Sequence, residues 1–177
     1  MMRNIIEDIQ NLYRMSNVER FTGTFHHQHY NIAEHCYRTA ILFKWWASIE
    51  DVAYTMHEFD IVLQHDAVEA ITGDLTYPVK NFSEETKRAW AVIEKELTQG
   101  THLEKYSDEN IKAALNERQY ALFKCCDYLE LLIFCIKEIT YGNRSKEILE
   151  TRDTCMKLIH RHGKDFPRIL AYISMYE

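Results

Sequence analysis

Apolar residues recur at helical intervals along most of the chain. Over residues 2–14 they lie three or four positions apart, which predicts a short amphipathic helix. A polar, histidine-rich loop is expected over residues 16–30. Asn31 and Glu34 then have the spacing of a capping box, and the apolar positions behind them predict a helix of about five turns.

The next apolar run predicts a third helix over residues 56–71, which the sequence Thr-Gly-Asp is expected to end. Residues 75–82 contain a proline and are expected to form a loop. Ser83 suits the N-cap of a fourth helix that ends near Gly100, and its first turn is acidic, as the helix dipole favours.

The second half of the chain predicts further helices. Residues 107–141 contain neither Gly nor Pro and are strongly apolar, which predicts a long, buried helix, with or without a short helix before it. Residues 144–162 predict another helix, closed by Gly163, and Pro167 suits the first turn of a terminal one. We therefore expect an all-α bundle of about six to eight helices, with residues 1–177 forming one domain.

Composition and charge narrow the class of protein. Of 177 residues, 46% are hydrophobic and only five are Gly and two Pro, which excludes a disordered or fibrous protein. The formal net charge is −6 and the Lys and Arg residues are scattered, which disfavours binding of polymeric nucleic acid. The five Cys lack a C-x-x-C spacing and are expected to be buried, reduced thiols. Neither a signal peptide nor a membrane span is evident, so we expect a cytoplasmic protein.

Polar residues interrupt the third predicted helix at positions that share one face. His65 and Glu69 are four residues apart and Asp66 and Glu69 three apart, so an imidazole and two carboxylates would project to one side. Such a group is costly unless it binds something. Taken alone, the His-Asp pair also fits an exposed helix end, and Glu69 fits a solvent-facing carboxylate.

Two further polar residues lie in otherwise apolar helices. His35 is one turn into the second predicted helix, and Asp127 stands among cysteine, aromatic and leucine residues. A buried carboxylate without a partner is costly, so a cation or a strong hydrogen-bond donor must face Asp127. A hydrogen-bonded structural histidine and a polar contact between two helices are the simpler interpretations of these two residues.

The order His, His-Asp, Asp, with each element on its own predicted helix, resembles the HD superfamily. The most similar members are the 5′-deoxynucleotidases and the short phage-type dATP triphosphohydrolases. This closer resemblance rests on E-R-F (19–21), A-E-H (33–35), H-D-A-x-E-x-x-T-G-D-L (65–75), P-V-K (78–80) and Asp127. These motifs cover most of the chain up to Asp127, whereas the C-terminal part contributes little. The resemblance implies an HD-type helical bundle and a hydrolase.

The resemblance also implies a metal site in which one divalent cation is bound by His35, His65, Asp66 and Asp127. Two imidazoles and two carboxylates suit Mn²⁺, Co²⁺, Fe²⁺, Ni²⁺ or Zn²⁺ rather than thiophilic metals, and further Mg²⁺ can accompany substrate phosphates. Glu69 would be the general acid or base.

Four residues are implied as substrate contacts. Arg20 has the guanidinium fork that matches two phosphate oxygens, and Lys80 offers a second cation. Phe21 stands where much of the family has Trp; it can stack on a sugar or base but donates no hydrogen bond, or it packs the loop against the core. Asp74 is similar to a family position that contacts the deoxyribose, and alternatively it forms an Asx turn.

We therefore expect a metal-dependent phosphohydrolase that cleaves the 5′-phosphoester of a 2′-deoxynucleotide. A deoxyadenosine nucleotide is favoured, with Phe21, residues 22–25 and residues 77–78 as candidate base walls, and the sequence leaves monophosphate and triphosphate open. The apolar C-terminal half predicts a homo-oligomer.

Two other functions fit the pattern less well. A non-catalytic metal-dependent nucleotide sensor is disfavoured by the intact Glu69. An HD-type di-iron oxygenase needs extra histidine ligands between the His-Asp pair and the last Asp, and this interval holds only His102. The three loop histidines, at positions 26, 27 and 29, are expected at the surface or the edge of the substrate pocket.

Overall fold

The computed structural model describes residues 2–75, 77–80 and 82–176, and their regular elements are helical. The α-helices are α1 (Met2–Met15), α2 (Ile32–Ile49), α3 (Met56–Leu63), α4 (Glu69–Thr72), α5 (Tyr77–Lys80), α6 (Glu84–Thr98), α7 (Asp108–Ala114), α8 (Glu117–Thr140), α9 (Lys146–His162) and α10 (Pro167–Ile173). Three 3₁₀ turns lie at His102–Tyr106 (η1), Gly163–Asp165 (η2) and Ser174–Tyr176 (η3). Eight of the described helices have seven or more residues, so the predicted all-α class is confirmed.

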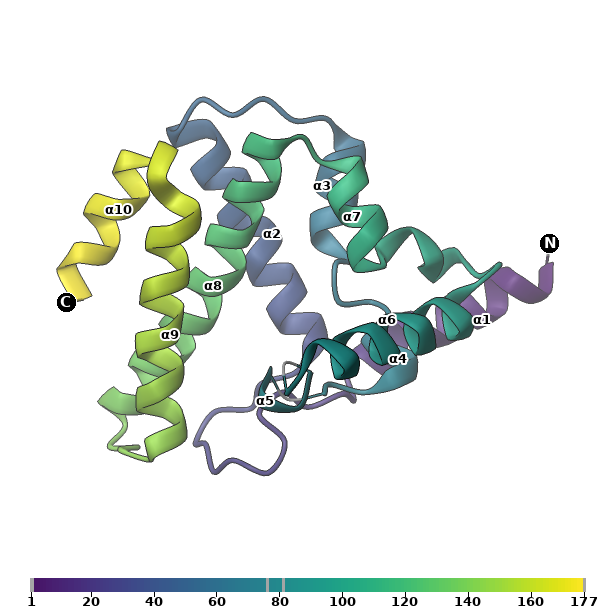
Figure 1. The fold of residues 1–177 in the computed structure, drawn as a ribbon, viewed down its shortest axis with the longest axis horizontal. Helices are drawn as coiled ribbons and strands as arrows, with labels where there is room; N and C mark the ends of the chain where they lie inside the picture. The colour runs from purple at the N-terminus through teal and green to yellow at the C-terminus, as the bar shows by residue number, and fades with distance from the viewer. Residues whose placement is uncertain (1, 76, 81, 177) are drawn as a thin grey trace.

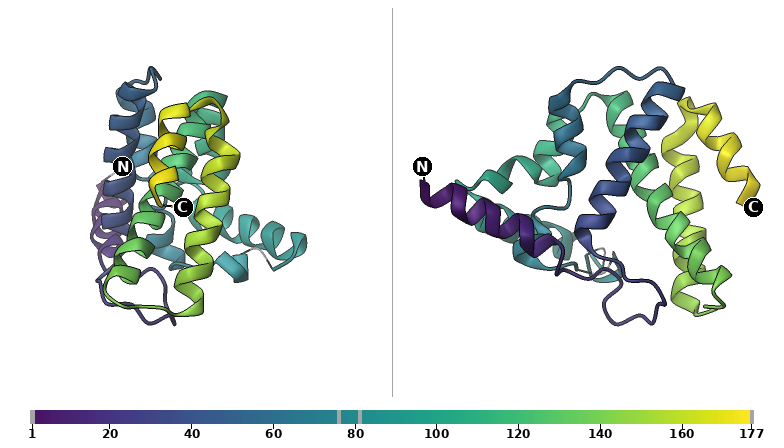
Figure 2. Two further views of the ribbon diagram at one scale, coloured as in Figure 1. Left: turned by 90° about the vertical axis from the view of Figure 1, so that its left-hand side faces the viewer. Right: turned by 180° about the vertical axis from the view of Figure 1, so that it is seen from behind.

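Helix α8 is the central element of the bundle. It packs against α9 along its length and against α2 on another side, and α2 in turn contacts α3 (Figure 1). Helix α1 packs against the short α4, and α6 stands out from the bundle in the left view of Figure 2. The metal-ligand candidates of α2 and α8 are therefore on neighbouring helices.

Side-chain caps define several of the predicted helix starts. Asn31 accepts a hydrogen bond from the Glu34 backbone N–H at 2.9 Å, as its spacing predicted. The Glu34 carboxylate does not complete the capping box, because it pairs with Arg38 at 2.8 Å instead. Ser83 caps α6 through the Thr86 N–H.

The prediction of one continuous helix over residues 56–71 was wrong. Helix α3 ends at Leu63, residues 64–68 form a series of turns, and α4 begins at Glu69. The His65 imidazole bonds to the Val62 carbonyl at 2.9 Å, so this side chain takes part in the chain reversal itself. The helix then stops at Gly73, where φ is +75°, as the Thr-Gly-Asp sequence predicted.

The expectation that residues 75–82 form only a loop also needs correction. Residues Tyr77–Lys80 form the single helical turn α5. Proline is compatible with a first helical turn, because the backbone N–H that it lacks would have no partner there. This turn places Lys80 in contact with Glu69.

The core is built from the facing sides of α2, α3, α8, α9 and α10. All five cysteines are buried and free, in agreement with the sequence prediction. In the part of the chain that the structure describes, none of the helices has the length and apolarity needed to cross a membrane.

Glu138, near the end of α8, holds the loop between α1 and α2. Its carboxylate is fully buried and accepts hydrogen bonds from the His27 and Gln28 backbone N–H groups at 2.8 and 3.0 Å, and from the Asn143 amide at 3.0 Å. Burial alone would raise the pKa of Glu138, but the hydrogen bonds from Asn143, His27 and Gln28 lower it to about 2. The loop is thus fastened by an ionised carboxylate.

We expect Glu138→Ala to lower the free energy of unfolding at pH 7 by ~1–3 kcal/mol, because buried N–H groups lose their acceptor. Since the folded pKa lies below the ordinary value of 4.5, this stabilisation is complete above that value and is lost as the pH falls towards 2. Urea unfolding at pH 7 and pH 3 would measure both effects, with the exposed Glu96→Ala as control. Equal stability of the two variants at pH 7 would contradict the assignment.

Candidate metal centre and its two cavities

Three separate segments bring the predicted metal ligands together. His35 comes from the second turn of α2, His65 from the turns after α3, and Asp127 from the middle of α8. The Nε2 atoms of His35 and His65 are 3.2 Å apart, and Asp127 Oδ1 is 3.2 Å from the first and 3.9 Å from the second. These three groups form a cluster that can hold a metal ion.

Asp66 lies beside this cluster. Its Oδ2 atom is 3.6 Å from His35 Nε2 and 3.5 Å from His65 Nε2. It also accepts a hydrogen bond from Arg20 at 2.7 Å. The structure therefore brings His35, His65 and Asp127 into one cluster and places Asp66 beside it.

The imidazoles present the nitrogen that a cation needs. His65 donates Nδ1–H to the Val62 carbonyl, and burial lowers the pKa of His65, so its Nε2 carries a lone pair. His35 donates Nδ1–H to Glu130 at 2.7 Å, and its Nε2 faces the same point. Two buried ring nitrogens that face one another with carboxylates beside them form a place for positive charge, which is either the proton that the raised pKa of His35 keeps on its ring or a divalent cation that replaces it.

The electrostatics of the cluster favour positive charge. Burial and the Arg20 guanidinium lower the pKa of His35, but hydrogen bonds with Asp127 and Glu130 outweigh them and raise it to about 9. Burial would raise the pKa of Asp127, yet the contacting Lys124 ammonium and His35 hold it well below its ordinary value. The carboxylates are thus ionised and attract a cation.

Sequence reasoning missed Glu130 and Tyr30, which support His35 from behind. Glu130 is 4% exposed and accepts from His35, and the buried Tyr30 hydroxyl donates to the same carboxylate oxygen. Glu130 follows Asp127 by three residues on α8, and this spacing puts both carboxylates on one helix face. That i, i+3 spacing was the available signal. A carboxylate behind a ligating histidine fixes its tautomer and raises its basicity.

Glu69 lies close to the cluster with one oxygen without a hydrogen-bond partner. Oε1 contacts Lys80, whereas Oε2 is buried, unbonded and 4.0 Å from Arg20. Burial, and then repulsion by Asp66, raise the pKa of Glu69 to about 8, although Lys80 and Arg20 act in the opposite direction. The protonated acid is therefore accessible near neutral pH, which suits a proton donor.

Arg20 stands between the cluster and a cavity of about 410 Å³. Residues of the loop, α8 and α9 surround this space, which we call the aromatic cavity; it is lined by Arg20, Phe21, Thr24, Asp74, Tyr128, Leu131, Glu147, Glu150, Thr151, Thr154, Cys155 and Leu158. The Phe21 ring also packs on Phe134 with centroids 5.4 Å apart. Phe21 thus fits both interpretations, the loop staple and the cavity wall. The side chains of residues 77 and 78, the other candidate base wall, lie outside the described part.

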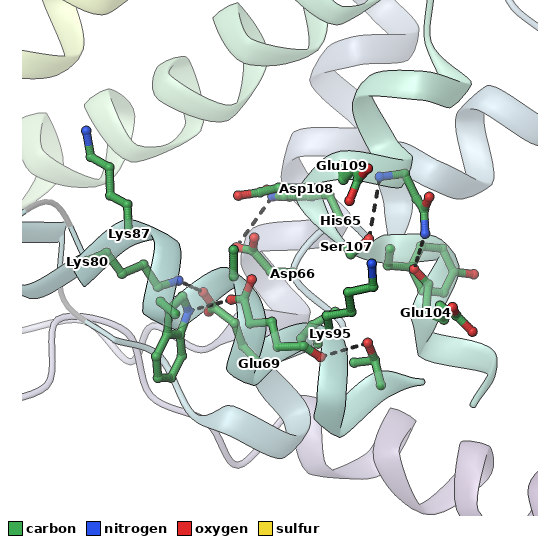
Figure 3. A pocket seen from close by; sticks show the side chains of 17 residues that line it. His65, Asp66, Glu69, Lys80, Lys87, Lys95, Glu104, Ser107, Asp108 and Glu109 are labelled. Carbon is green, nitrogen blue, oxygen red and sulfur yellow. Dashed lines mark hydrogen bonds and ion pairs between the residues drawn. The ribbon is translucent and has the colours of Figure 1, made fainter. Parts of the chain in front are cut away.

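A second cavity, of about 470 Å³, reaches the cluster at His65 and Asp66 and shares no lining residue with the aromatic cavity. His65, Asp66, Glu69 and Lys80 form one side of it, and α6, η1 and α7 form the opposite side. Figure 3 shows Glu69 and Asp66 facing a wall that includes Ser107, Asp108 and Glu109. We call it the acidic cavity. Two spaces of different chemical character therefore adjoin the site, one at Arg20 and the other at His65 and Asp66.

The loop histidines of the described chain have other partners and do not gather at a second metal site. His26 bonds to the Gln28 carbonyl at 2.6 Å and the exposed His29 pairs with Glu19 at 2.8 Å. Among the described residues no ligand group includes a loop histidine. The Cys36 thiol lies near His65 and Asp66, but burial raises its pKa well above the ordinary value, so it stays protonated.

Comparison with known proteins identifies the family. The family model described as 5′-deoxynucleotidase YfbR-like matches residues 9–173. The chain belongs to the YfbR-like family. The 5′-deoxynucleotidase YfbR of Salmonella paratyphi B is 29% identical over 154 residues, which cover 80% of this chain and 77% of that protein. The chain is therefore an HD-domain, metal-dependent phosphohydrolase of the YfbR-like 5′-deoxynucleotidase type.

Two solved structures show the same fold as this YfbR-like chain. An HD-domain phosphohydrolase from Listeria innocua superposes with a TM-score of 0.79 at 20% identity, covering 97% of this chain and 86% of that one. The HD phosphohydrolase DatZ of cyanophage S-2L, solved with dA and one catalytic Zn²⁺ ion, gives a TM-score of 0.71 at 20% identity and covers 93% and 95%. The predicted HD-type bundle is confirmed.

We expect Glu130→Gln to weaken divalent-metal affinity by roughly 10- to 100-fold, because His35 loses its charged acceptor. Tyr30→Phe removes only the hydroxyl that orients Glu130 and should weaken metal binding less. Competition with a chromophoric chelator would measure the affinities, and Glu117→Gln, exposed on the same helix, is the matched control. Wild-type affinity in Glu130→Gln would refute the supporting role.

Proposed function

We propose that this chain hydrolyses the phosphoester at the 5′-oxygen of 2′-deoxynucleoside monophosphates, with deoxyadenosine as the favoured nucleoside. The observation that supports it most is the cluster of His35, His65 and Asp127, with Asp66 beside it and the unbonded Glu69 oxygen at its edge. The YfbR-like family and the dA bound to the cyanophage protein favour a deoxynucleotide.

The metal would be held by His35, His65, Asp66 and Asp127. The mixed nitrogen and oxygen donor set suits Mn²⁺, Co²⁺, Fe²⁺, Ni²⁺ or Zn²⁺. A divalent cation bound there would polarise the phosphoryl group and supply hydroxide from a bound water at neutral pH.

The phosphate would be gripped by side chains that the structure brings next to the cluster. The Arg20 guanidinium, 14% exposed, can turn its fork from Asp66 to two phosphate oxygens, and its Nε is buried without a partner. Lys80 adds a second cation at the edge of the same site. Both cations would offset the negative charge that develops on the phosphoryl oxygens.

The leaving nucleoside needs a proton on its 5′-oxygen. Glu69 has an unbonded oxygen and a pKa raised to about 8, which makes it the proton donor in this proposal. Asp74, which lines the aromatic cavity with Phe21, would accept the 3′-hydroxyl, and Phe21 would stack on the sugar or base. The scissile bond would then lie between the aromatic cavity and the cluster.

Phosphate release from dAMP, AMP and dATP, before and after chelation, tests the reaction. We expect orthophosphate from dAMP, slower release from AMP, loss of activity on chelation and recovery with Mn²⁺, Co²⁺ or Zn²⁺. Inorganic triphosphate from dATP as the main product would replace this proposal with a triphosphohydrolase. Binding of dAMP without turnover in any of these metals would indicate a sensor.

Two variants distinguish the role of Glu69 from that of His65. Glu69→Gln should keep wild-type metal content while slowing turnover by ~10²-fold or more, because it removes the proton donor but no ligand. His65→Ala should lose metal and activity together. Metal analysis by mass spectrometry beside steady-state kinetics checks both; full activity in Glu69→Gln would exclude it as the acid.

A further inference from the structure

We propose that Glu94 on α6, together with Asp108 at the start of α7, makes this site select a monophosphate over a triphosphate. This inference rests on the proposed function and assigns the residues that set the length of the phosphate chain. Neither residue belongs to the metal cluster or to the groups that grip the first phosphate.

The two cavities indicate where the phosphate chain of a longer substrate would lie. A deoxynucleoside in the aromatic cavity puts its 5′-phosphate at the cluster, beyond Arg20. A β- and a γ-phosphate would have to continue past the cluster, away from the nucleoside. The space there is the acidic cavity, whose lining includes Asp66 and Glu69 (Figure 3).

The far wall of the acidic cavity carries an excess of negative charge. Its carboxylates come from α6, η1 and α7 and are Glu94, Glu104, Asp108 and Glu109; its lysines are Lys87 and Lys95 of α6. Lys87 is paired with Glu84 at 2.7 Å. This pair reduces the positive charge that the far wall offers to a polyphosphate.

Glu94 is the carboxylate of this wall that is partly buried rather than exposed. The Trp90 indole N–H holds its Oε1 at 2.5 Å, so the carboxylate has a fixed position. Burial and then the charge of Asp108 raise the pKa of Glu94, Lys80 lowers it, and Asp66 adds to the rise. Glu94 is thus within electrostatic reach of both the catalytic side and the α7 side of the cavity.

A second observation, at Glu69, marks the end of the acidic cavity where the phosphate would react. Glu69 is 5% exposed, and its Oε2 is buried without a hydrogen-bond partner at the margin of this same space. A buried, unsatisfied oxygen is costly, which indicates that a ligand group completes it. The acidic wall therefore faces the place where the phosphate reacts.

The consequence is a charge filter. Two further phosphoryl groups add roughly two negative charges, and these would stand against the partly buried Glu94 and the more exposed Asp108. A monophosphate ends at the cluster and meets Arg20 and Lys80 instead. The wall therefore penalises dATP much more than dAMP.

The test compares kcat/KM for dAMP and dATP in Glu94→Gln, Asp108→Asn and the double variant of the metal-loaded enzyme, without added Mg²⁺. Glu94→Gln keeps an oxygen for the Trp90 N–H, so the fold is preserved while the charge is removed. We expect the dATP-to-dAMP ratio of kcat/KM to rise by ~10-fold or more in the double variant. The control is Glu96→Gln, an exposed residue of α6 outside the cavity lining, which should leave the ratio unchanged.

Several outcomes would overturn the filter. An unchanged ratio in the double variant, or equal gains on both substrates, would show that the wall does not distinguish them. A fall in dATP hydrolysis would mean that the carboxylates assist the triphosphate. If the wild type already hydrolyses dATP as fast as dAMP, the filter fails while the phosphohydrolase assignment stands; hydrolysis of neither refutes the assignment itself.

Discussion

Two buried imidazoles whose Nε2 atoms face one another at 3.2 Å are the constraint around which this protein is organised. Each ring is held from behind, His65 by the Val62 carbonyl and His35 by Glu130, so neither can turn away. Positive charge must lie between the two rings, and either the proton that the raised pKa of His35 keeps on its imidazole or a divalent cation in its place meets that need. The surrounding carboxylates and the proposed metal chemistry follow from that requirement.

The sequence predicted the long elements well because their apolar periodicity and caps are local. The bounds of α2, α6 and α9 agree with the pattern to within a few residues, and Gly73 ends α4 as expected. The interruption of the helix after Leu63 was missed because residues 64–68 contain neither Gly nor Pro, the residues that usually mark the end of a helix in a sequence. Their turns are stabilised by a side-chain bond of His65, which propensity does not report. The helical turn over residues 77–80 was hidden by its proline.

The residues of the candidate site were likewise predicted only in part. The motif predicted one site for His35, His65, Asp66 and Asp127; the structure brings the two histidines and Asp127 into one cluster, with Asp66 beside it. Glu130 was not predicted, because a glutamate in a buried helix has no motif of its own. Its role as the hydrogen-bond acceptor of His35 depends on where α2 lies against α8. The sequence did not predict the acidic wall either, because α6, η1 and α7 meet there only through tertiary packing. Spacing along one helix is readable, whereas distances between helices are not.

Helix α8 supplies the metal-ligand candidate Asp127, the histidine support Glu130 and the loop anchor Glu138. In a helix that rises about 1.5 Å per residue, the ligand and the anchor stand roughly 16 Å apart with a fixed angle between them. Inserting or deleting a single residue between these positions would swing one relative to the other by about 100° and break either the cluster or the loop. This stretch of α8 can therefore change its side chains on the outer face, but its length is not free to vary.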